Sequence, residues 1–273
     1  MPIPRLFHPE HLLGQGIMSF GLLRSFLGLS NHFDFLSMLA FSDKSLWVDD
    51  FNGDAANTIR FLETQISAGG TLTYPAVVNG IARVTTGSAG AGDGMVLAGN
   101  LTWMGDLNIV AETRVRANIV TTLKVEFGFG NLAGRDTAIV DSYDTPTLQT
   151  GQTDVFVAVV DTGGTNGGRW QLVTDGSTAN MNATATQSGE AFGAAATTLT
   201  TAAADTYDRM TLTGTGNRAR MYRNGKSLAH NGAALASQFE GGTAVAPYLT
   251  AFTLTNADKL IDFDYLMVGQ DRT

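Results

Sequence analysis

Two acidic residues near the end of the chain have a spacing at which carboxylate chemistry could occur on a strand. Asp262 and Asp264 alternate within residues 260–269, LIDFDYLMVG, and because successive side chains of a strand point to opposite faces, both are expected on one face. Two carboxylates on one face can act as general acid and nucleophile on a glycosidic bond. Glu112 and Glu126 are single acids on the predicted polar faces of two other strands, where we expect water to solvate them.

The sequence contains few residues that could bind a metal ion or act as a catalytic nucleophile. The chain contains no Cys, which excludes thiolate ligands, disulfides and a cysteine nucleophile. The histidines, none of which forms a His-x-x-x-His motif, are His8, His11, His32 and His230. Asp161 and Asn166 lie on a glycine-rich segment and could offer oxygen ligands to Ca²⁺. An ordinary loop is the simpler interpretation, so we predict no metal site and no cofactor.

Arginine and aromatic residues offer a way to bind anions or sugars. Four arginines share one predicted hairpin of an otherwise acidic chain: Arg209, Arg218, Arg220 and Arg223. They could bind an anionic glycan or an acidic partner, or they could form local ion pairs on solvated faces. Trp103 and Trp170 could stack on sugars from the surface, although a place in the core is the simpler interpretation. The candidate glycan-binding residues are Trp170, Arg220 and Tyr222.

Composition separates this chain from nucleic-acid-binding proteins. Charged residues make up 15% of it, against about 25% in an average soluble domain. The net charge of −8 and the pI near 4.9 lack the positive charge that drives binding to DNA or RNA. With 273 residues, 44% of them hydrophobic, the chain can bury a sizeable core.

From residue 46 onward the periodicity is that of strands. In residues 107–118, LNIVAETRVRAN, apolar side chains alternate with charged ones, and residues 123–129 repeat the pattern. Each run predicts one core face and one polar face. Residues 154–161, DVFVAVVD, are apolar on both faces, which predicts a central strand covered on both sides. Many short strands separated by turn signals indicate a sandwich or a barrel.

A change in composition predicts two parts, an N-terminal arm of residues 1–45 and a β domain of residues 46–273. Before Thr58, the first threonine, Phe, Leu and Gly dominate. Residues 14–29 are apolar on nearly every side of a helical wheel, unlike a lone surface helix. Three interpretations remain: a membrane segment, a short helix or extended segment packed on the chain's own β domain, and an arm that docks on another protein.

We favour the arm that docks on another protein. The apolar run is shorter than the roughly 18 to 20 residues of a membrane span, and Arg24 interrupts it. The N-terminus also lacks the small-residue cleavage site of a secretory signal. Large apolar side chains carry much of an interface's energy. The predicted partner-binding residues are Phe7, Phe20, Leu22, Leu23, Phe26, Leu27, Phe33, Phe35 and Phe41.

Residues 207–228 carry a resemblance to a known family. They read YDRMTLTGTGNRARMYRNGKSL, in which two strands lead to Asn224 and Gly225, a pair suited to a two-residue type I′ hairpin turn. This segment closely resembles the W/Y-x-R … V-x-V-Y-x-N-G-K hairpin of concanavalin A-like (laminin G-like) jelly-roll domains.

Other parts of the chain extend the resemblance. Residues 260–269 look like the closing strand of that fold, and residues 47–51 and 80–85 look like the opening strands that pair with it. The resemblance covers roughly residues 46–273. It implies an all-β jelly-roll sandwich of two antiparallel sheets.

The resemblance implies architecture rather than chemistry. Retaining glucanases of this fold carry an E-x-D-x-E strand, and legume lectins carry a metal cluster of Glu-x-Asp followed by Asn-Asp; neither motif occurs in this sequence. Asp262 and Asp264 take the place of structural acids in the family's closing strand. We therefore predict no catalytic residue and a protein that is not an enzyme.

Two functions follow as hypotheses, with a third behind them. The leading one is a virion structural protein, a bacteriophage capsid accessory or decoration protein whose arm binds other virion proteins such as the major capsid protein. Phage head and tail proteins are similar in style to such a module with an attachment segment, on the capsid or tail surface, and symmetric self-assembly is expected. The alternative is a lectin-like glycan-binding module on a virion or cell surface, using the concave sheet or residues 163–168. A polysaccharide-cleaving enzyme of the same fold comes third.

Overall fold

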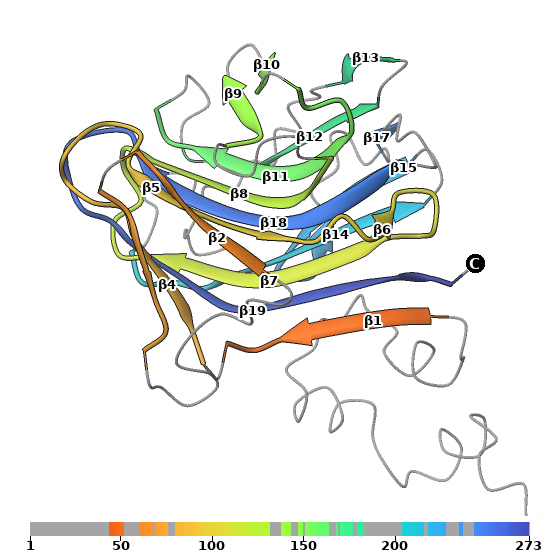
Figure 1. Cartoon of the computed structure of the whole chain (residues 1–273), viewed down its shortest axis with the longest axis horizontal. Coiled ribbons are helices and arrows are strands. Elements are labelled where there is room, and N and C mark those ends of the chain that lie inside the picture. The colour runs from red at the N-terminus through yellow and green to blue at the C-terminus, as the bar shows by residue number, and fades with distance from the viewer. Residues whose placement is uncertain are drawn as a thin grey trace, which may run out of the picture.

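The computed structural model of the chain describes most of the predicted β domain. The described residues are 44–51, 61–67, 69–75, 80–131, 138–142, 147–149, 151–163, 168, 170–176, 179–182, 204–215, 218–227, 235–236 and 243–272. Strands pack there as two antiparallel sheets, one above the other in Figure 1. The predicted all-β jelly-roll sandwich is confirmed.

Sheet A is the lower layer in Figure 1. Its strands follow the spatial order β16 (Lys226–Ser227), β15 (Arg218–Arg223), β14 (Asp208–Thr215), β7 (Val110–Ala117), β19 (Leu260–Asp271), β4 (Ala82–Thr85) and β3 (Thr71–Thr73). Two further strands pair with members of this path, β1 (Lys44–Asp49) with β19 and β17 (Leu235–Ala236) with β15. Both predicted opening strands thus pair with the closing strand β19, as the resemblance implied.

Sheet B is the upper layer and curves around a short hairpin. Its spatial order is β13 (Ala179–Asn182), β12 (Trp170–Gly176), β11 (Val155–Asp161), β8 (Leu123–Gly130), β18 (Ala244–Thr253), β5 (Gly94–Gly99) and β2 (Phe61–Ile66), with β6 (Trp103–Met104) beside β18. The hairpin of β9 (Val140–Ser142) and β10 (Thr147–Leu148) lies on the concave side (Figure 1).

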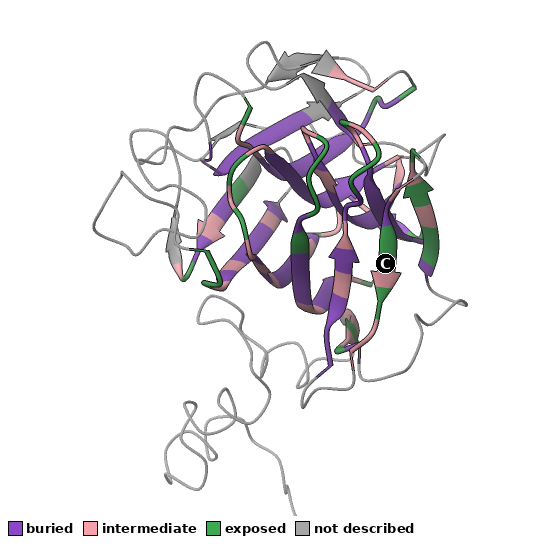
Figure 2. Cartoon of the chain, turned by 90° about the vertical axis from the view of Figure 1, so that its left-hand side faces the viewer, coloured by how far each residue is buried: buried purple, intermediate pink, exposed green. Residues whose placement is uncertain are grey.

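The main hydrophobic core lies between the two sheets. Val115 and Phe263 of sheet A belong to the same buried cluster as Phe127 and Leu249 of sheet B, and Figure 2 shows buried residues along most of the central strands. A second cluster on the other face of sheet B contains Val157 and other residues of its central strands. Strand β11 is therefore covered on both faces, which confirms the interpretation of its uniformly apolar sequence.

The predicted hairpin turn at the end of β15 is also confirmed. Arg223 pairs with Lys226 across a two-residue loop, and Asn224 and Gly225 both have positive φ, 48° and 86°. A type I′ turn needs positive φ at both central residues, because only then does its twist match that of the strands.

One expectation about the sheets was wrong. Glu112 and Glu126, predicted to be solvated, are both 0% exposed, and Lys124 beside Glu126 is 2% exposed. Alternation identified the faces correctly, but an outward face is solvated only where nothing covers it. Strand β9 lies over Lys124 and Glu126 on the concave side of sheet B. Glu112, on β7 of sheet A, is instead bound by the side chains of Thr211 and Tyr265. Both acids are therefore candidate site residues.

Candidate functional site

The concave face of sheet B carries a buried cluster of charged side chains. On β8, Leu123, Val125 and Phe127 point into the core between the sheets. Lys124 and Glu126 alternate with them and therefore point to the concave side, where Ile139 and Val140 pack against the second apolar cluster.

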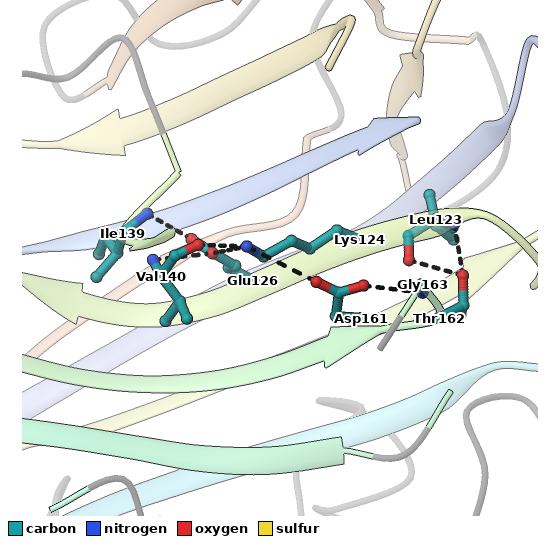
Figure 3. A network of polar contacts seen from close by, with 8 residues as sticks. All are labelled: Leu123, Lys124, Glu126, Ile139, Val140, Asp161, Thr162 and Gly163. Atoms are coloured by element: carbon teal, nitrogen blue, oxygen red, sulfur yellow. Dashed lines mark hydrogen bonds and ion pairs between the residues drawn. The ribbon is translucent and has the colours of Figure 1, made fainter. Parts of the chain in front are cut away.

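Glu126 holds the start of β9 through both of its carboxylate oxygens (Figure 3). Ile139 N donates to Glu126 Oε2 at 2.7 Å, and Val140 N donates to Oε1 at 3.0 Å. Lys124 Nζ donates to the carbonyl oxygen of Val140. One acidic and one basic side chain of β8 thus bind successive backbone groups of the segment that covers them.

Lys124 is surrounded by further groups that favour its charge. Its Nζ lies 3.7 Å from Glu126 Oε1 and 3.9 Å from Asp161 Oδ2, and it stands over the Phe252 ring, 5.4 Å from the centroid. Asp161 also accepts from Gly163 N at 2.9 Å. Burial raises the pKa of Glu126, while Lys124 and the two backbone N–H groups oppose that shift.

This cluster does not have the form of a glycosidase carboxylate pair. The concave-facing positions of β8 at 124, 126 and 128 hold Lys, Glu and Gly, so this strand offers one carboxylate. The other acid in the described cluster, Asp161, lies opposite Lys124 in the strand register. Because Glu126 accepts two backbone hydrogen bonds under β9, its oxygens are occupied in holding the fold together.

The outer face of sheet A carries a second group of charged residues, brought together by a β-bulge. The register of β19 against β7 shifts between Phe263 and Leu266. A bulge places two residues of one strand opposite one of its partner, so Asp264 and Tyr265 both reach the outer side chains of β7. Asp264 Oδ2 accepts from Arg114 Nη1 at 2.6 Å, and Tyr265 Oη donates to Glu112 Oε1 at 2.6 Å.

Asp262 is bound by two arginines at once. Arg83 donates to its two oxygens at 2.6 and 2.9 Å, and Arg116 donates to Oδ2 through Nε at 2.9 Å and Nη2 at 2.8 Å. Burial raises the pKa of Asp262, but these hydrogen bonds outweigh burial, and the net shift is downward. Asp262 and Asp264 are therefore held in ion pairs, as expected for structural acids.

An aromatic ring and a further arginine complete this surface. The Tyr207 ring lies 4.5 Å from the Arg114 guanidinium and 4.9 Å from that of Arg116. Arg209 stands opposite Arg114 in the register of β14 and β7. We call the surface formed by these residues on and beside sheet A the arginine face: Arg83, Arg114, Arg116, Tyr207, Arg209, Asp262 and Asp264.

The predicted glycan-binding residues do not form one site. Trp170 is 0% exposed and belongs to the main core, and its Nε1 donates to Asp208 Oδ2 at 3.3 Å. Its assignment to sugar stacking was wrong, because a ring enclosed between two sheets has no free face. Arg220 is exposed and Tyr222 is partly exposed on β15, on the same outer side of sheet A as Arg209.

The hairpin arginines have different environments. Arg223 is buried and its Nε binds Asp208 Oδ1 at 2.7 Å, which fits the interpretation of local ion pairs. Arg209 and Arg220 reach the surface instead. Trp103 is 9% exposed in the main core, where its sequence context placed it.

Several predictions concern residues outside the described part of the chain. These are residues 1–43 of the arm with its predicted anchors Phe7, Phe20, Leu22, Leu23, Phe26, Leu27, Phe33, Phe35 and Phe41, the four histidines, and Asn166 of the hypothetical calcium site. Within the described residues, no three acidic or histidine side chains gather as metal ligands. That same part of the chain has no helix long and apolar enough to cross a membrane.

Sequence reasoning missed most of the arginine face. Arg83 and Tyr207 were not considered, and Arg114 and Arg116 were noted only as part of a polar strand face. The usable signal was the pairing of two alternations, Arg114-x-Arg116 and Asp262-x-Asp264, on strands expected in one sheet. Opposite charges at matched spacing favour neighbouring strands.

Comparisons with known proteins identify the fold. No family model and no curated protein sequence matches the chain. Among solved structures, a protein of unknown function from Shewanella oneidensis MR-1 has a TM-score of 0.55 at 9% identity, over 94% of this chain and 96% of that one. The Emp47p carbohydrate recognition domain has a TM-score of 0.52 at 12% identity, over 85% and 97%.

The fold is therefore that of the concanavalin A-like jelly-roll proteins, which include both binding proteins and enzymes. A Bacillus licheniformis β-glucanase matches with a TM-score of 0.50 at 11% identity, over 82% of this chain and 97% of that one. Identities this low define the architecture alone. The fold by itself is compatible with carbohydrate binding and with catalysis. The residues of the site must distinguish these two functions.

Proposed function

We propose that this chain is a non-enzymatic structural protein of a virus particle, a bacteriophage capsid accessory or decoration protein. The observation that carries the non-enzymatic part is the use of Glu126: both oxygens bind backbone amides, and position 128 of the same face is Gly. A concave face on which β8 offers one carboxylate, already bound to backbone amides, suits a scaffold that presents a surface.

The proposed attachment element is the arm, residues 1–45. Its Phe- and Leu-rich sequence precedes β1, which pairs with the C-terminal half of β19 in sheet A. Burial of each large apolar side chain in a contact with another virion protein, such as the major capsid protein, would contribute about 1.5–3 kcal/mol. Repetition in a symmetric particle would turn weak contacts into durable attachment.

Binding to particles that lack the protein tests this proposal. We expect the triple variant Phe20→Ser, Phe26→Ser, Phe33→Ser to leave the particles bare, because each change removes a buried apolar contact. The matched triple variant with Leu at the same positions should retain most of the occupancy, since it keeps apolar volume. Normal occupancy of the serine variant would contradict the proposal.

A second candidate function is glycan binding by a lectin-like module on a virion or cell surface. The observation that favours it is the arginine face, a polar surface on which two guanidinium groups lie over one aromatic ring, on a fold shared with a carbohydrate recognition domain. A saccharide array probed with the intact chain tests it. Binding to no saccharide would remove this candidate.

The same array separates binding from cleavage. The non-enzymatic proposal expects every bound polysaccharide to keep its chain length on prolonged incubation. A shortened product would instead identify an enzyme, and loss of that turnover in the Asp264→Asn variant would assign it to this chain.

A further inference from the structure

We propose that the arginine face binds an anionic polysaccharide, one that carries carboxylate or sulfate groups, and that Arg209 is its principal contact. This inference deepens the glycan-binding candidate above and rests on it. It adds the chemical class of the ligand and the surface that receives it.

Arg209 differs from the other arginines of this face. Arg83, Arg114 and Arg116 each have an ion pair with Asp262 or Asp264. Among the described residues, no carboxylate forms an ion pair with Arg209. Its Nε is buried and has no hydrogen-bond partner there. Buried donors are nearly always bonded to protein, to water or to a ligand. The guanidinium group of Arg209 therefore has hydrogen-bonding capacity that its described neighbours leave unused.

The surroundings of Arg209 add to its preference for an anion. It lies directly opposite Arg114 in the register, and like charges opposite each other on neighbouring strands are destabilising. An anion held between the two guanidinium groups would remove that repulsion and accept charge-assisted hydrogen bonds from both. Arg114 uses Nη1 for Asp264 and is 40% exposed.

Most of the positive charge on this face is paired. The guanidinium groups of Arg83, Arg114 and Arg116 form ion pairs with the carboxylates of Asp262 and Asp264. The neighbouring acid Glu112 is buried and accepts from Thr211 and Tyr265. Arg209 is therefore the guanidinium group of this face that is available to a bound anion.

The spacing of this surface suits a polysaccharide. A sheet face offers side chains at intervals of about 4.8 Å between strands, so that successive strands can meet successive sugar units. Tyr222 and Arg220 continue the same face on β15, beyond Arg209.

The experiment measures binding of the intact chain to three polymers by isothermal titration calorimetry. Polygalacturonate supplies carboxylates, dextran sulfate supplies sulfates, and dextran is neutral. We expect one or both of the charged polymers to bind, dextran not to bind, and affinity to fall as salt is raised. The Arg209→Gln variant should bind about ten- to a hundredfold more weakly, because charge-assisted hydrogen bonds are lost.

Two further variants separate a site from general charge. Arg209→Lys keeps the charge but not the planar fork and should give an intermediate affinity. Arg220→Gln removes the same charge from the same sheet face and should weaken binding less than Arg209→Gln. Unchanged thermal unfolding of all three variants would show that the fold is intact.

Contrary results would overturn either the anion site alone or glycan binding as a whole. Equal losses in the Arg209→Gln and Arg220→Gln variants, or dextran binding as tight as dextran sulfate binding, would overturn the anion site while leaving glycan binding in place. Binding of no polymer here and of no saccharide on the array would overturn both. Poly-glutamate is titrated in the same way as a fourth polymer. If it binds more tightly than either charged polysaccharide, the choice of a polysaccharide is overturned in favour of an acidic protein.

Discussion

Single residues show how environment sets opposite properties in chemically similar groups. Glu126 is enclosed under β9, and burial raises its pKa. Asp262 is also buried, but Arg83 and Arg116 bind its carboxylate and lower its pKa. Asp264 lies two residues further along the strand. Burial raises its pKa and outweighs the effect of Arg114, the one arginine that lowers it, so the net shift is upward. Asp262 has two bound guanidinium groups, whereas Asp264 has one and the negative charges of Asp262 and Asp50 nearby, so the pKa shifts of the two aspartates have opposite signs.

Replacing Glu126 by Ala should strongly destabilise the β domain. The change leaves two backbone amides and the buried Lys124 ammonium without their carboxylate. Breaking a buried ion pair from one side costs about 3–5 kcal/mol. Urea unfolding measures this loss, with Glu126→Gln expected to retain part of the stability and Asp258→Ala, at an exposed carboxylate, expected to change little. A loss below about 1 kcal/mol for Glu126→Ala would argue against the role of this cluster.

The two aspartates of β19 should affect acid stability in opposite directions. Because its folded-state pKa is lowered, Asp262 contributes stability above its unfolded pKa of about 4 and loses it as the pH falls further. The raised pKa of Asp264 has the reverse effect, since protonation of that group favours the folded state. Free energies of unfolding between pH 7 and pH 3 should therefore fall less steeply in Asp262→Asn and no less steeply in Asp264→Asn than in the wild type. A flattened profile in both variants would contradict the assignment.

At the scale of elements, two local features decide which side chains meet. The bulge of β19 between Phe263 and Leu266 aims Asp264 and Tyr265 together at β7. On β8, Gly128 lies where a Cβ would collide with the carbonyl oxygen of Phe156 and lie 2.7 Å from the Cα of Val157. Close packing of β8 on β11 thus leaves no room for an acid at that position of the concave face.

Gly128→Ala should destabilise the chain by about 1–3 kcal/mol, the range expected when local backbone strain is introduced. The matched control is Gly90→Ala, where nothing lies within 4 Å of the added Cβ. Thermal unfolding of both variants measures the difference. Equal stability of the two would mean that β8 and β11 can separate without cost.

For the whole molecule, the described β domain is a two-layer sandwich whose first strand, β1, begins at Lys44. The predicted division at residue 45 remains a prediction. A chain that starts at Lys44 would retain every strand of both sheets, so the arm can be tested separately from the sandwich.

Sedimentation velocity of the intact chain and of the chain that starts at Lys44 provides that test. We expect defined assemblies for the intact chain and a compact monomer for the shortened one, because the shortened chain lacks the Phe and Leu side chains that the proposed contact would bury. Retained thermal unfolding of the shortened chain is the control. If both the intact and the shortened chain sediment as monomers, the result would instead favour an arm that packs in the core of its own domain.

Alternation of apolar and polar residues predicted an all-β chain, and the Asn-Gly pair predicted the type of turn at Asn224. The jelly-roll architecture and the pairing of the opening strands with β19 were implied by the family resemblance, and the structure confirms both. The absence of the glucanase triplet could also be read from the sequence. The three acids of E-x-D-x-E lie within one strand, so the motif would be contiguous in the chain.

The sequence did not predict which polar faces are covered or which charged side chains meet. Alternation predicted that Lys124 and Glu126 belong to a solvated strand face. In the structure, β9, which comes later in the chain, covers them. Arg83 and Arg116 come from separate strands to one carboxylate of β19, and Arg209 is left without an ion pair among its described neighbours. Burial and ion pairing depend on contacts between residues distant in the chain, which local periodicity does not encode.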